Sequence, residues 1–92
     1  MDITIGVRRD KKSKFKDLEL IHIKGDGVEE CGGKMVQTFK NKQWDIICEK
    51  CKRLLNIMEE GDIERMILEV ARDGKERKFG VYGSTVTAVL IE

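Results

Sequence analysis

The sequence lacks proline, contains one tryptophan, one tyrosine and one histidine, and carries charges that nearly cancel. Its 18 lysines and arginines against 17 acidic residues leave a net charge of +1, which excludes a polycationic nucleic-acid coat and an acidic disordered tail. No apolar run approaches the roughly 18 residues of a membrane span, and the stretch from Ile3 to Val7 is too short for the core of a signal peptide. We therefore expect a cytoplasmic protein that does not enter a membrane.

What the sequence does contain is enough apolar material for one modest core. It has 92 residues, of which 40% are hydrophobic and 38% charged. No linker, repeat or low-complexity tract divides the chain, so residues 1–92 are predicted to form one domain. The spacing of apolar residues predicts an α+β fold in which an antiparallel sheet packs against one amphipathic helix. The predicted order is two strands, a loop, the helix and three strands.

The last third of the chain predicts a three-stranded meander. Asp73-Gly74 is typical of a two-residue hairpin turn, and Gly83-Ser84 can form a second one. Pairing across both turns gathers apolar residues on one face of the meander. The predicted strands are 64–72, 75–82 and 85–91, with the facing pairs Leu68/Phe79, Val81/Val86, Phe79/Ala88 and Arg77/Leu90.

A helix that starts at Asp62 is the alternative for the first of these three segments. Such a helix leaves Leu68 outside its apolar face and leaves the Asp-Gly turn unused, so the strand is preferred. The residues that the helix would align are Ile63, Met66, Ile67 and Val70.

The N-terminal part of the chain predicts a second hairpin. Apolar and polar residues alternate up to Val7, a polar loop follows at 10–13, and 15–23 is typical of a strand. In this pairing Ile21 and Ile23 fall on the other face, which requires either a bulge after Leu20 or burial on both sides. The predicted pairs are Val7/Lys16, Ile5/Leu18 and Ile3/Leu20.

Residues 41–60 predict the amphipathic helix. Apolar residues recur at i, i+3, i+4 and i+7 within an arc of about 120°. Asn41 can cap the start, Gly61 can end the last turn, and Ile46 and Ile57 are exceptions to the pattern. The predicted core-facing residues are Trp44, Ile47, Cys48, Cys51, Leu54, Leu55 and Met58. Before this helix, residues 24–34 form an irregular Gly-rich segment, followed by a short strand at 35–39.

The three cysteines and the single histidine allow two main interpretations. In the first they are core residues, because Cys48 and Cys51 lie in the apolar arc and His22 shares a strand face with Leu20. In the second, the C-x-x-C pair Cys48 and Cys51 chelates one zinc ion, joined by Cys31 and by His22 as a fourth ligand.

A short part of the sequence favours the zinc interpretation by resemblance. Cys31-Gly32-Gly33-Lys34, a hairpin through Trp44, and the Cys48-x-x-Cys51 pair resemble the zinc ribbons of small phage restriction-alleviation proteins. The resemblance covers residues 31–51 and implies zinc as cofactor. That pattern has a further cysteine where this chain has Val28, so a site of four cysteines is excluded. A zinc site would also need residues 44–51 to form a strand and a knuckle in place of the predicted helix.

Catalysis has little support in the sequence. A thioredoxin-type use of the Cys48-x-x-Cys51 pair needs Cys48 at a helix N-terminus and a cis-proline beside it, whereas the predicted helix places Cys48 in its middle and the chain has no proline. One histidine and two serines offer no nucleophile–base spacing. We therefore expect no enzyme activity.

Basic residues gather at the first hairpin loop and around Asp73-Gly74. If both loops point the same way, they form a basic surface for phosphates or for an acidic protein face. The sequence thus predicts a small non-catalytic module that binds a protein or nucleic-acid partner through these loops or a sheet edge, with a homodimer as one option and the zinc-binding domain as the alternative. The predicted partner-binding residues are Arg8, Arg9, Lys11, Lys12, Lys14, Lys75, Arg77 and Lys78.

Overall fold

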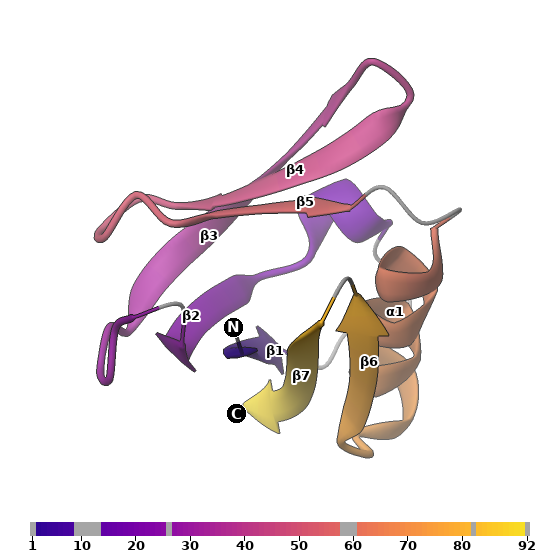
Figure 1. Cartoon of the computed structure of the whole chain (residues 1–92). Helices are drawn as coiled ribbons and strands as arrows, with labels where there is room; N and C mark the ends of the chain where they lie inside the picture. The colour runs from indigo at the N-terminus through magenta and orange to yellow at the C-terminus, as the bar shows by residue number, and fades with distance from the viewer. Residues whose placement is uncertain (1, 9–13, 26, 58–60, 82, 92) are drawn as a thin grey trace.

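The computed structural model describes residues 2–8, 14–25, 27–57, 61–81 and 83–91, without the side chains of 56, 57 and 81. These parts contain seven strands, one α-helix and one short 3-10 turn (Figure 1). The elements are β1 (Asp2–Arg8), η1 (Phe15–Asp17), β2 (Leu20–Gly25), β3 (Gly33–Lys40), β4 (Gln43–Cys48), β5 (Leu54–Ile57), α1 (Asp62–Asp73), β6 (Arg77–Val81) and β7 (Ser84–Ile91).

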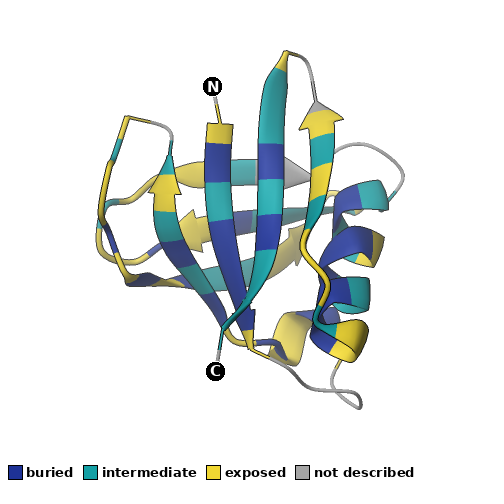
Figure 2. Cartoon of the chain, turned by 90° about the horizontal axis from the view of Figure 1, so that it is seen from below, coloured by how far each residue is buried: buried dark blue, intermediate teal, exposed yellow. Residues whose placement is uncertain are grey.

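All seven strands belong to one curled, mixed sheet. Its order is β5-β4-β3-β2-β1-β7-β6. The central β1 and β7 run parallel, and the other neighbours run antiparallel. Figures 1 and 2 show that β3, β4 and β5 cross over the layer made by β2, β1, β7 and β6. The prediction of an antiparallel sheet with a three-stranded meander is therefore wrong, because the chain ends pair with each other along β1 and β7.

The core lies between the two halves of the curled sheet, and α1 covers its side at β1, β6 and β7. Alternate residues of the central strands point into it, as the buried bands in Figure 2 show. Within the described parts of the chain, no helix has the length and apolar character to cross a bilayer. The largest fully buried side chains are Ile5, Val7, Leu20, His22, Met35, Ile46, Cys48, Ile63, Ile67, Val70 and Val86.

The prediction of a helix over 41–60 is wrong, because residues 43–57 form β4, a tight turn and β5. Its apolar pattern fits strands equally well. Ile46, an exception to the helical pattern, is fully buried, whereas Ile47 and Leu54 are exposed. Two β-branched isoleucines beside Trp44 favour a strand over a helix. Met58, also predicted to face the core, lies outside the described residues.

The segment predicted as the first strand of the meander forms the helix α1 (Asp62–Asp73). This is the helix from Asp62 that was the alternative prediction. Its buried face is formed by Ile63, Met66, Ile67, Val70 and Ala71. Gly74 adopts the left-handed conformation with φ 74°, and its N–H donates to the carbonyl of Val70, which ends the helix. A hairpin turn and a helix C-cap both need glycine at positive φ, so Asp-Gly favours either structure. Gly61, predicted to end a helix, precedes this one.

Both remaining hairpins exist, with registers that differ from the predictions. β6 and β7 pair through Val81/Ser84, Phe79/Val86 and Arg77/Ala88, two residues from the predicted register, so the same side chains still share a face.

In the first hairpin the shift is four residues. Residues 15–17 form η1, which buries Phe15 and delays the start of β2 to Leu20. Val7 therefore faces Leu20 instead of Lys16. The register shifts between Thr4 and Ile5, opposite Ile23, so the irregularity lies later in β2 than the bulge that was one of the two options after Leu20. Ile21 and Ile23 are half-buried.

Candidate metal centre

Four side chains with metal-binding atoms meet at one end of the curled sheet. His22 comes from β2, Cys31 from the loop before β3, and Cys48 and Cys51 from the end of β4 and the turn after it. The Nδ1 atom of His22 lies 3.2 Å from Sγ of Cys51, and Sγ of Cys31 lies 3.5 Å from Sγ of Cys48. All four ligand atoms lie within 4.8 Å of one another. The group has the composition and size of a site for one metal ion.

Backbone hydrogen bonds carry Cys31 to the group. The loop between β2 and β3 folds back along β2, so the N–H of Cys31 donates to the carbonyl of Ile23 and that of Gly32 to the carbonyl of His22. Gly32 adopts a left-handed conformation with φ 73°. These bonds place Cys31 beside His22.

The turn from Cys48 to Cys51 is a knuckle that points both thiols to the same side. The N–H of Lys52 donates to the carbonyl of Cys48, and the N–H of Cys48 donates to the carbonyl of Arg53, both at 2.9 Å. Lys52 has φ 65°, which turns the chain back into β5. The N–H of Glu49 donates to the carbonyl of Lys34 and fixes the knuckle to β3.

Gly33 leaves the space that the thiols occupy. A Cβ at this position would lie 2.7 Å from Sγ of Cys48, 3.2 Å from Sγ of Cys31 and 2.5 Å from Cβ of Lys50. Sulfur and carbon atoms do not approach a real Cβ so closely. A side chain at position 33 is therefore incompatible with the observed arrangement of the cluster.

The cluster is buried unevenly. His22 is 0% exposed, and its buried Nε2 has no hydrogen-bonding partner among the described residues. Cys31 and Cys48 are also buried, whereas Cys51 is half-buried. A buried polar ring with one unpartnered nitrogen is costly for folding, and an apolar side chain would avoid that cost. The interactions of Nδ1 with the neighbouring thiols are therefore the ones that can offset the burial of the His22 ring.

The two buried thiols differ in acidity. Burial raises the pKa of the Cys31 thiol. Burial also opposes ionisation of Cys48, but hydrogen bonds from the backbone N–H groups of Cys51 and Lys50 outweigh it and lower the pKa of Cys48 to about 6. The thiolate is the form that binds metals, so the knuckle prepares Cys48 as a ligand.

Lys50 adds a positive charge at the edge of the cluster. Its Nζ donates to the carbonyl oxygen of Cys31 over 2.9 Å, which ties the knuckle to the loop that carries the third thiol. A divalent ion bound by three thiolates and a neutral imidazole leaves a net negative charge, which a nearby ammonium group stabilises.

The residues named by the zinc interpretation are the ones that the fold assembles. The strand and knuckle that this interpretation required over 44–51 are present as β4 and its turn. Cys48 is the last residue of strand β4 and does not begin a helix, unlike the reactive cysteine of a thioredoxin-type site. No role in the site was predicted for Gly33 or Lys50, although the Gly-Gly pair directly after Cys31 is a signal of close backbone approach.

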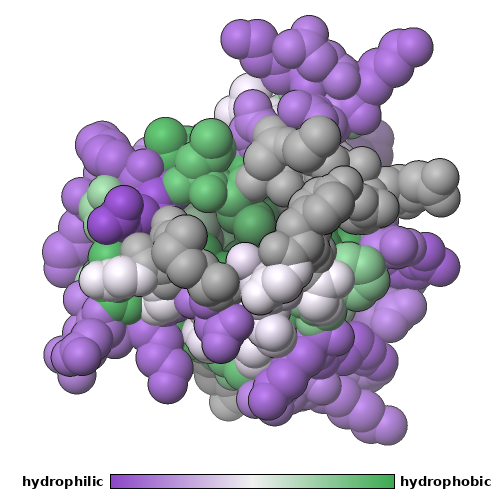
Figure 3. Space-filling model, viewed as in Figure 1, coloured by the Kyte–Doolittle hydropathy of each residue, from purple (hydrophilic) through white to green (hydrophobic). Residues whose placement is uncertain are grey.

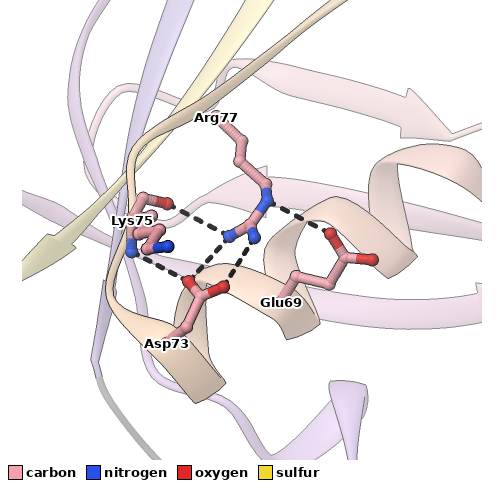
Figure 4. Close-up of polar contacts among 4 residues, drawn as sticks. All are labelled: Glu69, Asp73, Lys75 and Arg77. Carbon is pink, nitrogen blue, oxygen red and sulfur yellow. Dashed lines mark hydrogen bonds and ion pairs between the residues drawn. The ribbon is translucent and has the colours of Figure 1, made fainter.

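Two of the predicted partner-binding residues that the structure describes form ion pairs. Arg9, Lys11 and Lys12 lie outside the described residues, and Lys14 and Lys78 are exposed. Arg8 forms an ion pair of 2.7 Å with Glu19. Arg77 contacts both carboxylate oxygens of Asp73 at 2.8 and 2.6 Å and also pairs with Glu69 at 3.1 Å, beside the backbone of Lys75 (Figure 4). Part of the predicted positive surface is therefore neutralised.

Comparisons with known proteins do not assign the chain to a family. No protein-family model, no curated protein and no solved structure matches the chain significantly. The functional argument therefore depends on the geometry of the site.

Proposed function

We propose that this protein is a small zinc-binding recognition domain in which His22, Cys31, Cys48 and Cys51 hold one structural zinc ion. The observation that carries this proposal is the convergence of four ligand atoms, from three separate segments of the chain, within 4.8 Å. The zinc ion would stabilise the fold, and the surface of the folded domain would recognise a partner.

The dimensions of the cluster support zinc. Zinc bonds of about 2.3 Å to sulfur and about 2.0 Å to nitrogen give a tetrahedron with edges of about 3.8 Å between sulfurs and about 3.5 Å between sulfur and nitrogen. The contacts Cys31–Cys48 at 3.5 Å and His22–Cys51 at 3.2 Å are within a few tenths of an ångström of those edges. Three thiolates and one imidazole are a ligand set that zinc binds in structural sites.

The number and burial of the ligands support a structural role for the ion. Four protein ligands fill a tetrahedral zinc site and leave no open position for a substrate. The ion would link β2, the loop before β3 and the β4–β5 turn, which lie on both sides of β3 in the sheet. A chain of 92 residues has a modest core, so such a link contributes substantially to its stability.

Thermal unfolding with and without a chelator tests this proposal, and Cys51→Ser is the decisive variant. Cys51 is only half-buried, so its loss removes a ligand with little change in packing. Val36→Thr is a matched control, because Val36 is also half-buried but lies outside the cluster. We expect the chelator to lower the Tm of the wild-type protein and of the control, and to leave the already lowered Tm of Cys51→Ser unchanged. A wild-type Tm that does not respond to chelator, with Cys51→Ser as stable as the control, would refute the proposal.

A further inference from the structure

The β3–β4 hairpin presents an aromatic side chain to solvent on a rigid support. Phe39 is 60% exposed, although it belongs to a regular strand. Its ring centroid lies 5.2 Å from that of Trp44, and the Trp44 ring lies 4.9 Å from the buried ring of Phe15. The three rings form a row from the core to the surface, which holds the outermost ring in place.

Exposed lysines lie next to these aromatic residues in the chain. Lys40 and Lys42 lie at the end of the hairpin, Lys14 and Lys16 flank Phe15, and all four are exposed. The same segments contain two acidic residues, at 17 and 45, so they carry an excess of positive charge. Figure 1 shows the hairpin projecting beyond the other strands, and Figure 3 shows hydrophilic side chains gathered at its end. Positive charge and an exposed aromatic ring thus occur on one projecting element.

The turn of this hairpin has a backbone conformation that glycine adopts at lower cost than lysine does. Asn41 and Lys42 have φ 53° and 63°, both in the left-handed region. A two-residue turn of this kind favours glycine at its second position, and another residue there costs about 1–2 kcal/mol. Glycine at position 42 would make a more stable hairpin. The property that lysine adds at this position is its charge, which points to a function at the tip.

We propose that the tip of the β3–β4 hairpin binds single-stranded nucleic acid. An unpaired base would stack on the exposed face of Phe39, while Lys40 and Lys42 contact the backbone phosphates. A duplex keeps its bases stacked inside and offers no free face to this ring, so the arrangement favours a single strand. An acidic protein face would engage the lysines and leave Phe39 without a stacking partner. The residues proposed to contact the nucleic acid, Phe39, Lys40 and Lys42, are not in the predicted partner-binding set, whereas Lys14 beside Phe15 is.

Binding of labelled oligonucleotides of about 15 nucleotides, measured by fluorescence anisotropy, tests the proposal. Oligo-dT and oligo-U distinguish DNA from RNA, and binding of either one supports it. The single tryptophan, Trp44, contacts Phe39, so its emission should change when a base stacks there. We expect Phe39→Ala to weaken binding at least about fivefold and Phe39→Tyr to retain it, because stacking on an aromatic ring is the lost interaction.

Lys42→Gly separates binding from folding. Glycine adopts the positive φ without steric cost, so this variant should have a higher Tm. It should nevertheless bind the oligonucleotide a few-fold more weakly, and the salt dependence of binding should fall by about one phosphate contact. Leu54→Ala and Lys78→Glu are controls, because Leu54 is 56% exposed and Lys78 is exposed on a different strand. Both should bind as the wild-type protein does. Circular dichroism and metal content should be unchanged in every variant, since Phe39 lies at the opposite end of β3 from Gly33.

Three results would overturn the proposal. The first is a wild-type protein that binds neither oligonucleotide at low salt. The second is binding that Phe39→Ala and Lys42→Gly leave unchanged. The third is equal binding of duplex DNA or of polyglutamate, which would indicate a general attraction of negative charge to the lysines.

Discussion

The Nδ1 atom of His22 lies 3.2 Å from the Sγ atom of Cys51, although the two residues are 29 positions apart in the chain. The segments that carry them are β2 and the turn after β4, and β3 lies between β2 and β4 in the sheet. Their side chains meet on the concave side, where the curl of the sheet brings them together. The cluster therefore depends on the curl, and an ion bound by both residues would in turn stabilise it.

Substitution of Gly33 should weaken metal binding without removing a ligand. In Gly33→Ala the new Cβ would overlap Sγ of Cys48 and Cβ of Lys50, so the knuckle must shift away from Cys31. We expect weaker zinc affinity and a loss of about 1–3 kcal/mol in unfolding free energy. Competition with a chromogenic zinc chelator measures the affinity, and urea unfolding measures the stability.

Gly80→Ala is the matched control for this experiment. Gly80 also lies in a strand and has no positive φ, and a Cβ there would lie 3.8 Å from the nearest atom, the carbonyl oxygen of Ser84. It should retain wild-type zinc affinity. Equal affinities for Gly33→Ala and Gly80→Ala would contradict the close approach described here.

The side chains of residues 67 and 68 distinguish the helix α1 from the strand that the Asp-Gly signal favoured. Ile67 is fully buried on the inner face of α1, whereas Leu68 is half-buried beside it. Ile67→Ala should therefore cost about 2–5 kcal/mol, and Leu68→Ala about 1–2 kcal/mol. Chemical denaturation of both variants measures the difference. A strand would reverse the order, because its predicted core face contains Leu68 and excludes Ile67.

The ion pair between Asp73 and Arg77 should make stability depend on pH in the acid range. Hydrogen bonds from the Arg77 guanidinium and from the N–H of Lys75 hold the pKa of Asp73 well below its usual range (Figure 4). A carboxyl whose pKa is lower in the folded state contributes its stability above its unfolded pKa of about 3.9 and loses it as the pH falls towards the folded value.

Unfolding free energies of wild type and Asp73→Asn between pH 7 and pH 2 test this. Asp73→Asn should be less stable at neutral pH, and the two curves should converge below about pH 4. Glu76→Gln removes an exposed carboxylate nearby and serves as the control for the loss of one negative charge. A constant difference between wild type and Asp73→Asn across this range would show that the ion pair adds no pH-dependent stability.

The sequence predicted local features better than the topology. Turn residues and alternation located the β6–β7 hairpin and the first hairpin, because both depend on neighbouring parts of the chain. The parallel pairing of β1 with β7 joins the two ends of the chain and leaves no local signal. In 41–60, an apolar pattern broken by a knuckle imitated a helical stripe, since Cys48 and Cys51 have a spacing of three in either structure.

The ligand set was predictable from chemistry, and its geometry was not. Cys48 and Cys51 have a spacing typical of zinc ligands, and Cys31 and His22 are the remaining cysteine and the single histidine of the chain. Their proximity depends on the fold-back of the loop before β3 and on the curl of the sheet. The supporting contact from Lys50 to the carbonyl of Cys31 likewise follows from the folded backbone alone.

Native mass spectrometry of protein purified without chelator, followed by reaction with a thiol-alkylating reagent, tests the zinc site most directly. The account predicts one bound zinc ion per chain and three thiols that resist alkylation until a chelator is added. The half-buried Cys51 is the most informative of the three, because only a bound ion would protect it. A metal-free mass together with rapid alkylation of Cys51 would contradict the account and leave the cysteines as packing residues.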